Sequence, residues 1–299
     1  MKMLVTGGAG FVGTNLIKRL LKDGHEVVSV DNYSAGTKEN HQEGCTYYDY
    51  DLSSSHTLGI YVDYGSYPSW RDDVYDTIFH MGALARIQPS IKNPHKTIFN
   101  NFVSTLNILE YARLKDIVFV YAGSSSYHHG LYESPYAWSK FSGEELCKLY
   151  SSVYDLPTSI CRFYNVYGQH QVEEGTWATV IGKFEKQFRN NKPLTIVGDG
   201  EQRRDFTHID DIVDGLIRIN RAMHGEVDMR YVGEIFELGK GENYSINEVA
   251  DMFGKDYPRI NLPVQKGEYD RTLADYSLAH DLLDWSPSVD LREYIRSVI

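Results

Sequence analysis

Residues 6–13 have the sequence Thr6-Gly7-Gly8-Ala9-Gly10-Phe11-Val12-Gly13. This turn lies between a β-branched run that predicts a strand, Lys2–Thr6, and apolar residues at helical spacing that predict a helix, Phe11–Leu21. Glycines at this spacing permit a tight turn, a close approach of a ligand to the backbone, and close packing of the helix on the strand. The first turn of the helix also offers free N–H groups and a partial positive charge. We therefore expect a phosphate group to bind here.

The residue after the second predicted strand indicates which kind of ligand this phosphate belongs to. Asp31 directly follows the strand Glu26–Val30. An acidic side chain at this point accepts hydrogen bonds from the ribose hydroxyls of adenosine and repels a 2′-phosphate. The turn and Asp31 together predict a bound dinucleotide, NAD rather than NADP. Asp51, after the third predicted strand, is a candidate contact of the adenine and equally a candidate cap of its own turn.

The order of predicted elements defines the fold class. The other predicted strands are Thr46–Tyr48, Thr77–His80, Ile117–Ala122, Thr158–Phe163, Leu194–Val197 and Ile235–Leu238, and the other predicted helices are Ile98–Arg113, Tyr136–Tyr154, Asp210–Arg221 and Ile246–Phe253. Their alternation in the first half is typical of a parallel sheet with helices on both faces. We expect an α/β protein whose Rossmann-type doubly wound sheet occupies residues 1–165. A smaller C-terminal α/β substrate domain, residues 166–299, should follow, with some crossing of the chain between the two. The aromatic stretch Ile60–Asp76 is expected to be a surface loop.

Composition excludes several classes of protein. The 299 residues carry 30 Lys and Arg against 41 Asp and Glu, a net charge of −11, which argues against nucleic-acid binding or adhesion to a membrane surface. The three scattered cysteines predict neither a disulfide framework nor a zinc site, and we expect no metal. Met1–Thr6 leaves no room for a signal peptide, and the apolar run Ile117–Ala122 is too short to span a membrane. We expect a cytoplasmic protein.

A tyrosine and a lysine one helical turn apart are candidate catalytic residues. Tyr136 and Lys140 stand at positions i and i+4 of a predicted helix and share a face. A free tyrosine has a pKa of about 10, and a nearby ammonium and a cationic nicotinamide would lower it. The strand upstream ends in Gly123-Ser124-Ser125-Ser126, where a serine hydroxyl can share the proton. Ser124 is the first candidate and Ser125 its rival. Such a pair also occurs by chance on helices, but its place behind a dinucleotide turn favours catalysis.

These segments together resemble the extended short-chain dehydrogenase/reductase superfamily, and within it the nucleotide-sugar epimerase/dehydratase family with its UDP-glucose 4-epimerase-like members. Further matching segments are Phe79-His80-Met81-Gly82-Ala83, Asn101, residues 162–168 (Arg-Phe-Tyr-Asn-Val-Tyr-Gly), residues 198–206 (Gly-Asp-Gly-Glu-Gln-Arg-Arg-Asp-Phe) and Arg271-Thr272-Leu273-Ala274-Asp275. The chain departs from the family pattern in the short segment between Ser124 and Tyr136 and in His128-His129, which replace the usual Tyr-Gly. The resemblance implies an NAD cofactor, a nucleoside-diphosphate sugar between two domains, and a homodimer formed through the helices Ile98–Arg113 and Tyr136–Tyr154.

The resemblance also implies the residues of the site. The catalytic residues it implies are Ser124, Tyr136 and Lys140. The NAD contacts it implies are Gly7, Gly10, Phe11, Val12, Gly13, Asp31, Asn32, Asp51, Leu52, Tyr136 and Lys140. The substrate contacts it implies are Ser125, Asn165, Val180, Val197, Arg204, Arg271 and Thr272. Arg204, Arg271 and Asn165 would bind the diphosphate. Where many relatives have a further arginine, this chain has Gln265-Lys266.

The residues after Ser124 bear on the reaction. In relatives that eliminate water or carbon dioxide, acidic residues stand near the serine, whereas here Ser125 and Ser126 occupy those positions. The resemblance therefore favours epimerisation at C4 of a UDP-hexose or a UDP-N-acetylhexosamine through a transient 4-keto sugar. Thr272, small where relatives have tyrosine, would leave space for the N-acetyl group. The alternatives are a dehydratase, a decarboxylase, a ketosugar reductase, or a catalytically weak NAD-binding protein.

Overall fold

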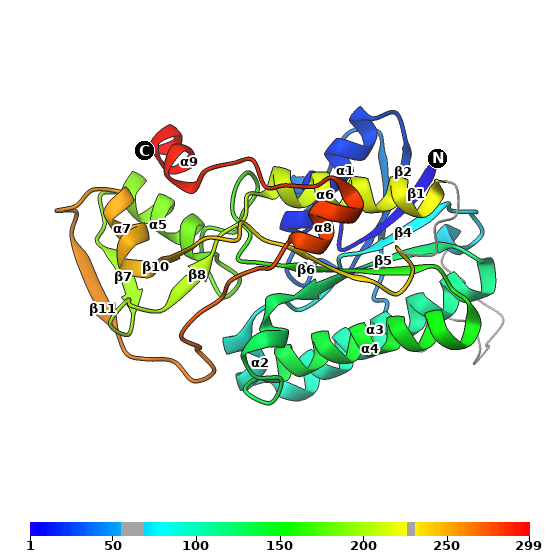
Figure 1. Ribbon diagram of the computed structural model, residues 1–299, viewed down its shortest axis with the longest axis horizontal. Helices are drawn as coiled ribbons and strands as arrows, with labels where there is room; N and C mark the ends of the chain where they lie inside the picture. Colours follow the sequence, from blue (N-terminus) through cyan, green and yellow to red (C-terminus); the bar gives the residue numbers. More distant parts are fainter. Residues whose placement is uncertain (55–68, 226–230) are drawn as a thin grey trace.

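A parallel sheet forms the centre of the protein. The computed structural model describes residues 1–54, 69–225 and 231–299, and within these residues the sheet has seven strands in the order β3-β2-β1-β4-β5-β6-β9 (Figure 1). The strands are β1 Lys2–Thr6, β2 Glu26–Asp31, β3 Cys45–Asp49, β4 Thr77–His80, β5 Val118–Ser124, β6 Thr158–Phe163 and β9 Ile235–Leu238. The strand order changes direction between β1 and β4, and ligands of such sheets bind outside the C-terminal ends of the strands at this point. The predicted Rossmann-type doubly wound sheet is confirmed.

Helices cover both faces of the sheet, as Figure 1 shows. On one face lie α1 Phe11–Lys22, α6 Ile209–His224 and α8 Ser277–Leu283, and on the other lie α3 Pro94–Lys115 and α4 Pro135–Tyr154. Successive strand residues point to opposite faces, so Met3 and Val5 pack in the first layer and Leu4 in the second. Because both faces are covered, the inner strands β1, β4, β5 and β6 are buried along nearly their whole length, as is usual for a parallel sheet.

A smaller body follows at the C-terminal side of the sheet. Its strands are β7 Leu194–Val197 with β11 Arg259–Leu262, and β8 Arg203–Asp205 with β10 Asn243–Ser245. Its helices are α5 Val180–Arg189, α7 Ile246–Met252 and α9 Leu291–Val298, which share a separate apolar core. The chain returns to the large sheet between these elements, because α6 and α8 pack on it and β9 pairs with β6. A domain boundary between residues 165 and 166 stays a prediction.

Several elements had no clear signal in the sequence. These are the short helix α2 Ile87–Lys92, the helices α5, α8 and α9, and the strands β8, β10 and β11. Most are too short to show a periodicity of their own. The sequence predicts that aromatic side chains anchor the stretch Ile60–Asp76. Residues 60–68 lie outside the described residues, and Trp70 and Tyr75 are buried, as such anchors require. Within the described part of the chain, no helix is both long and apolar enough to cross a membrane.

Candidate active site

The glycine turn has the close contacts that exclude side chains. Gly7 has a φ of 70°, and a Cβ atom on it would lie 2.6 Å from the Cα atom of Gly82. A Cβ atom on Gly13 would lie 2.3 Å from the carbonyl oxygen of Gly7. Heavy atoms cannot approach so closely, so the turn requires glycine at both positions. The N-terminus of α1 is therefore left open to a ligand, as the sequence predicts.

Asp31 lies at the end of β2 beside this turn. Its Oδ2 atom accepts a hydrogen bond from the N–H of Ala9 at 2.9 Å, and its Oδ1 atom accepts one from the N–H of Tyr33 at 2.8 Å. Burial raises the pKa of Asp31, while these two N–H groups act in the opposite direction. Asp51 instead accepts bonds from the N–H and hydroxyl of Ser53 at 2.9 and 2.7 Å, so it does cap its own turn. Both carboxyl groups line the same cavity.

One cavity of about 810 Å³ connects the glycine turn to the smaller body. Of the predicted NAD contacts it is lined by Gly7, Gly10, Phe11, Val12, Gly13, Asp31, Asn32, Asp51, Leu52 and Tyr136, and of the predicted substrate contacts by Ser125, Asn165, Val180 and Arg204. Ser124 lines it between the two groups. The structure therefore brings most of the predicted site residues, from both halves of the chain, around one space.

Ser124 and Tyr136 meet in this cavity despite the short segment between them. Ser124 is the last residue of β5, and α4 begins at Pro135, where the Ser134 hydroxyl accepts a bond from the N–H of Ala137 at 3.1 Å. The Tyr136 hydroxyl donates to the Ser124 hydroxyl at 3.3 Å. Ser124 Oγ also accepts bonds from the N–H and hydroxyl of Ser126 at 3.2 and 2.9 Å. The short connection between Ser124 and Tyr136 therefore leaves their hydroxyl groups within hydrogen-bonding distance.

Lys140 lies behind Tyr136 and not at the cavity surface. It is buried, and its Nζ atom is 4.2 Å from the centre of the Tyr121 ring. Burial lowers the pKa of Lys140 to about 8, and the Glu144 carboxylate opposes that shift. Burial raises the pKa of Tyr136, opposed by the bond to Ser124 and by the charge of Arg86. Arg86, which belongs to none of the motifs found in the sequence, also lines the cavity.

The two adjacent arginines of β8 point in different directions, as an extended chain requires. Arg204 lines the cavity, where its Nη2 atom is 3.0 Å from Glu268 Oε2 and its Cζ atom is 4.6 Å from the centre of the Tyr269 ring. Arg203 is directed away from the cavity, with its Nη2 atom 2.9 Å from Glu248 Oε2. Only Arg204 is placed to meet a ligand.

Three predicted substrate contacts, Val197, Arg271 and Thr272, do not line the cavity, and their contact with a substrate stays a prediction. Arg271 is exposed outside it, and Val197 is half-buried in β7. Thr272 has no exposed surface, and its hydroxyl accepts bonds from the N–H of Asp205 at 2.9 Å and from Asn165 Nδ2 at 3.2 Å. It joins two chain segments and leaves no surface for a sugar. Tyr269, two residues before Arg271, lines the cavity instead.

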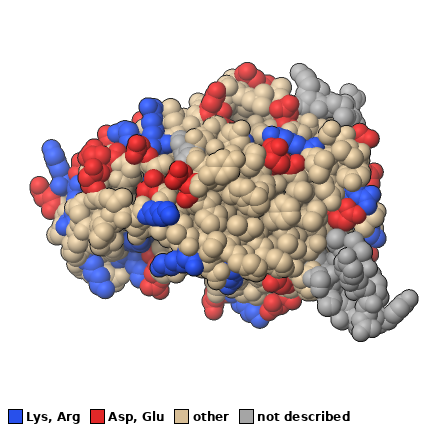
Figure 2. Space-filling view, turned by 90° about the horizontal axis from the view of Figure 1, so that it is seen from below, with Lys and Arg blue, Asp and Glu red and all other residues tan. Residues whose placement is uncertain are grey.

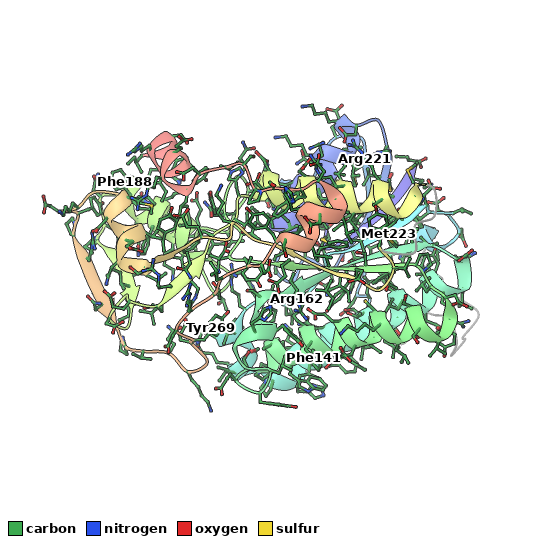
Figure 3. All side chains as sticks on the ribbon, in the orientation of Figure 1. Phe141, Arg162, Phe188, Arg221, Met223 and Tyr269 are labelled. Carbon is green, nitrogen blue, oxygen red and sulfur yellow. The ribbon has the colours of Figure 1, made fainter. Side chains whose placement is uncertain are left out.

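The side chain of His128 holds the altered loop after Ser124 in place. Its ring pairs with Glu237 of β9, which also accepts a bond from the Tyr164 hydroxyl at 2.6 Å. Burial opposes ionisation of Glu237, yet these bonds hold its pKa at about 2. Next to it, Arg162 forms a buried ion pair with Glu144 at 2.7 Å, between β6 and α4 (Figure 3). The unusual histidine therefore fastens the short loop to the large sheet.

Comparison with known proteins agrees with this site. Residues 3–239 match the family described as the NAD dependent epimerase/dehydratase family. The UDP-glucose 4-epimerase of Mycolicibacterium smegmatis is 30% identical over 100% of this chain and 97% of its own length. The UDP-glucuronate 4-epimerase of Thermodesulfobacterium geofontis is 32% identical over 99% and 94%. The solved structure of the UDP-glucuronic acid 4-epimerase of Bacillus cereus, in complex with UDP-glucuronic acid and NAD, matches with a TM-score of 0.83 and 29% identity over 100% of both chains.

The chain therefore belongs to the NAD dependent epimerase/dehydratase family and is an NAD-dependent enzyme of the epimerase/dehydratase type. The residues at the glycine turn fit this cofactor. A Cβ atom on Gly7 would collide with the backbone of Gly82, and one on Gly13 with the backbone of Gly7, so only glycines allow the tight turn that leads into the first turn of α1, where a pyrophosphate binds. Asp31 lines the cavity at the end of β2, where it can accept bonds from the adenosine ribose.

Proposed function

We propose that the protein epimerises a nucleoside-diphosphate hexose, most simply a UDP-hexose, at C4. The observation that carries the proposal is the hydroxyl pair of Tyr136 and Ser124, 3.3 Å apart in the cavity that also contains the glycine turn. Beside that pair stand Ser125 and Ser126, with no carboxylate for elimination of water or carbon dioxide. Such a site supports reversible oxidation at one carbon. Thr272 has no exposed surface, so it does not itself offer space for an N-acetyl group in the cavity.

The side chains then have distinct roles. Tyr136, as phenolate, takes the proton of the C4 hydroxyl, and Ser124 shares that proton through the hydrogen bond between them. NAD, when bound, supplies the acceptor for the C4 hydride and the source of its return. After the keto sugar has turned its opposite face to the cofactor, Tyr136 gives the proton back, so atoms and electrons balance over the cycle. Arg204 and Asn165 line the cavity where the diphosphate would lie.

The product of the purified enzyme tests this function. We expect NMR to find the C4 epimer of at least one of UDP-glucose, UDP-N-acetylglucosamine and UDP-glucuronate, without net accumulation of NADH. Formation of a UDP-pentose with release of carbon dioxide, formation of a stable ketosugar, or consumption of added NADH would instead identify a decarboxylase, a dehydratase or a reductase. A protein that binds NAD and converts none of the three sugars would contradict the proposal.

We also propose that two copies pair through α3 and α4. Phe99 on α3 and Leu149 on α4 are 46% and 50% exposed, and Trp138 is 37% exposed, so these apolar side chains do not all face the sheet. Figure 2 views this side of the molecule, and a broad area of it carries few charged side chains. Such surfaces are typical of homodimer interfaces. Light scattering should give twice the chain mass, and a monomer at micromolar concentration would contradict this. The cytoplasmic location stays a prediction from the sequence.

A further inference from the structure

Arg86 is a cation in the catalytic cavity that the proposed mechanism does not use. It precedes the first residue of α2, and its half-buried side chain lines the cavity together with Tyr136 and Tyr269. Removing a guanidinium from water costs free energy unless an anion or hydrogen-bond acceptors compensate. No acidic side chain among the described residues forms an ion pair with Arg86. A half-buried guanidinium that has no acidic partner among the described residues is a candidate for binding an anionic group of a ligand.

The hydrogen bonds of Arg86 leave one edge of the guanidinium available. Its Nε and Nη2 atoms both donate to the carbonyl oxygen of Trp177, at 3.1 and 2.8 Å. A guanidinium has five N–H groups in a planar fork, so the edge formed by Nη1 and Nη2 retains two parallel donors. Within the described residues no other partner of Arg86 is found. Two parallel donors match the two oxygens of a carboxylate.

The surroundings of Arg86 place it at the sugar end of the cavity. Its side chain lines the cavity together with Tyr136 and Tyr269, and the helix α2, which directly follows Arg86, packs against α4, the helix that carries Tyr136. Under the proposed function Tyr136 meets the C4 hydroxyl, so Arg86 lies close to C4 and its ring neighbour C5. Arg204 lies against Tyr269 from the smaller body, where Figure 3 shows Tyr269 facing α2. The two arginines therefore serve different parts of one ligand.

The remaining charges in the cavity do not oppose an anion at this end. Asp31 and Asp51 stand at the NAD end, after β2 and β3. Glu268 is paired with Arg204 at 3.0 Å. The strand end nearest the reaction carries the neutral hydroxyls of Ser124 and Ser125. The sugar end thus offers a ligand the guanidinium of Arg86 and neutral hydroxyl groups.

We propose that Arg86 binds a carboxylate on C5 of the sugar, so that the preferred substrate is a nucleoside-diphosphate hexuronate. This inference rests on the proposed function, because it uses Tyr136 to locate C4. Arg86 is a specificity residue: it selects the substrate and takes no part in moving the proton or the hydride. Its bond to Trp177 holds the guanidinium in place before the sugar arrives.

The test compares UDP-glucuronate with UDP-glucose in the NAD-loaded enzyme. We expect kcat/KM to favour UDP-glucuronate by at least about tenfold, since a charge-assisted forked bond contributes about that much or more. In Arg86→Gln this preference should fall by about 10²-fold, while Arg86→Lys should keep part of it. Lys96→Gln, which removes an exposed cation of α3 outside the cavity, should leave the preference within about twofold and serves as the matched control.

Several outcomes would overturn the inference. If Arg86→Gln lowers activity on both sugars equally, Arg86 only holds the loop at Trp177. If it weakens inhibition by UDP itself, Arg86 binds the diphosphate. An enzyme that epimerises UDP-glucose and ignores UDP-glucuronate would refute the hexuronate preference while leaving the proposed function intact. Conversely, calorimetry showing binding of UDP-glucuronate that depends on Arg86, without turnover of any sugar, would support this inference and refute the C4 epimerase.

Discussion

The two ends of the cavity are built in different ways. The NAD end consists of one continuous turn, residues 6–13, together with Asp31 at the end of the adjacent strand. The sugar end is assembled from four separate segments, which contribute Arg86, Trp177, Arg204 and Tyr269. The NAD end is shaped by the backbone geometry of one turn. The sugar end is shaped by contacts between segments that are distant in the sequence. Substitutions should therefore abolish function at the first end and change affinity or selectivity at the second.

The largest effect is expected where the two ends meet. Tyr136→Phe removes the group that accepts the C4 proton and should lower kcat by about 10²–10⁴-fold. NAD binding, measured by fluorescence titration, should change little, because the ring remains. Tyr154→Phe at the last residue of the same helix is the matched control, since this half-exposed side chain does not line the cavity. Turnover of Tyr136→Phe close to that of the wild type would refute the assigned base.

A steric change at the NAD end should come next. Gly13→Ala places a methyl group 2.3 Å from the Gly7 carbonyl oxygen, so the turn must open. We expect the affinity for NAD to fall by about 10²-fold or the protein to be recovered unfolded, with circular dichroism separating the two results. Gly225→Ala meets nothing closer than 3.6 Å and should bind NAD normally. An unchanged affinity in Gly13→Ala would show that the turn tolerates side chains.

At the sugar end the neighbouring arginines of β8 provide a direct contrast. Arg204→Gln should raise the KM for the nucleotide sugar by about 10–100-fold, the effect of losing a charge-assisted bond to a diphosphate. Arg203→Gln should change KM by about twofold or less, because that side chain pairs with Glu248 away from the cavity. Initial-rate kinetics measure both values. Equal changes in the two variants would disprove the assignment of the diphosphate end.

The smallest effect is expected at Thr272, and it should be one of stability. Thr272→Val leaves the N–H of Asp205 and the amide of Asn165 without their acceptor and should cost about 1–3 kcal/mol of unfolding free energy. Urea unfolding measures this, and Thr272→Ser, which keeps the hydroxyl, is the control. The relative rates on UDP-glucose and UDP-N-acetylglucosamine should stay the same. A selective change between those sugars would restore Thr272 to the substrate site.

Local patterns in the sequence determined the sheet, the glycine turn, Asp31 and the pair of Ser124 and Tyr136. Each of these depends on backbone conformation or on the end of a parallel strand, so spacing along the chain implies position in space. The sequence alone therefore predicted that the glycine turn and Asp31 lie together and that the hydroxyls of Ser124 and Tyr136 meet, while their roles in binding NAD and in catalysis stay proposals. Lys140 lies on the expected helix, but its burial behind Tyr136 depends on how α4 packs against β5, a contact that spacing within one helix does not reveal.

Only the tertiary structure decided the sugar end. Arg271 and Thr272 lie in a segment whose residues alternate between exposed and buried, and a shift of register exchanges the two sets. Spacing could not tell that Thr272 bonds to Asp205 while Tyr269 takes the cavity position. Arg86 belongs to no motif that was found in the sequence. Its guanidinium is positioned by a hydrogen bond to the carbonyl oxygen of Trp177, which is far away along the chain. Contacts between segments distant in sequence are set by the packing of the whole fold, and no local pattern encodes them.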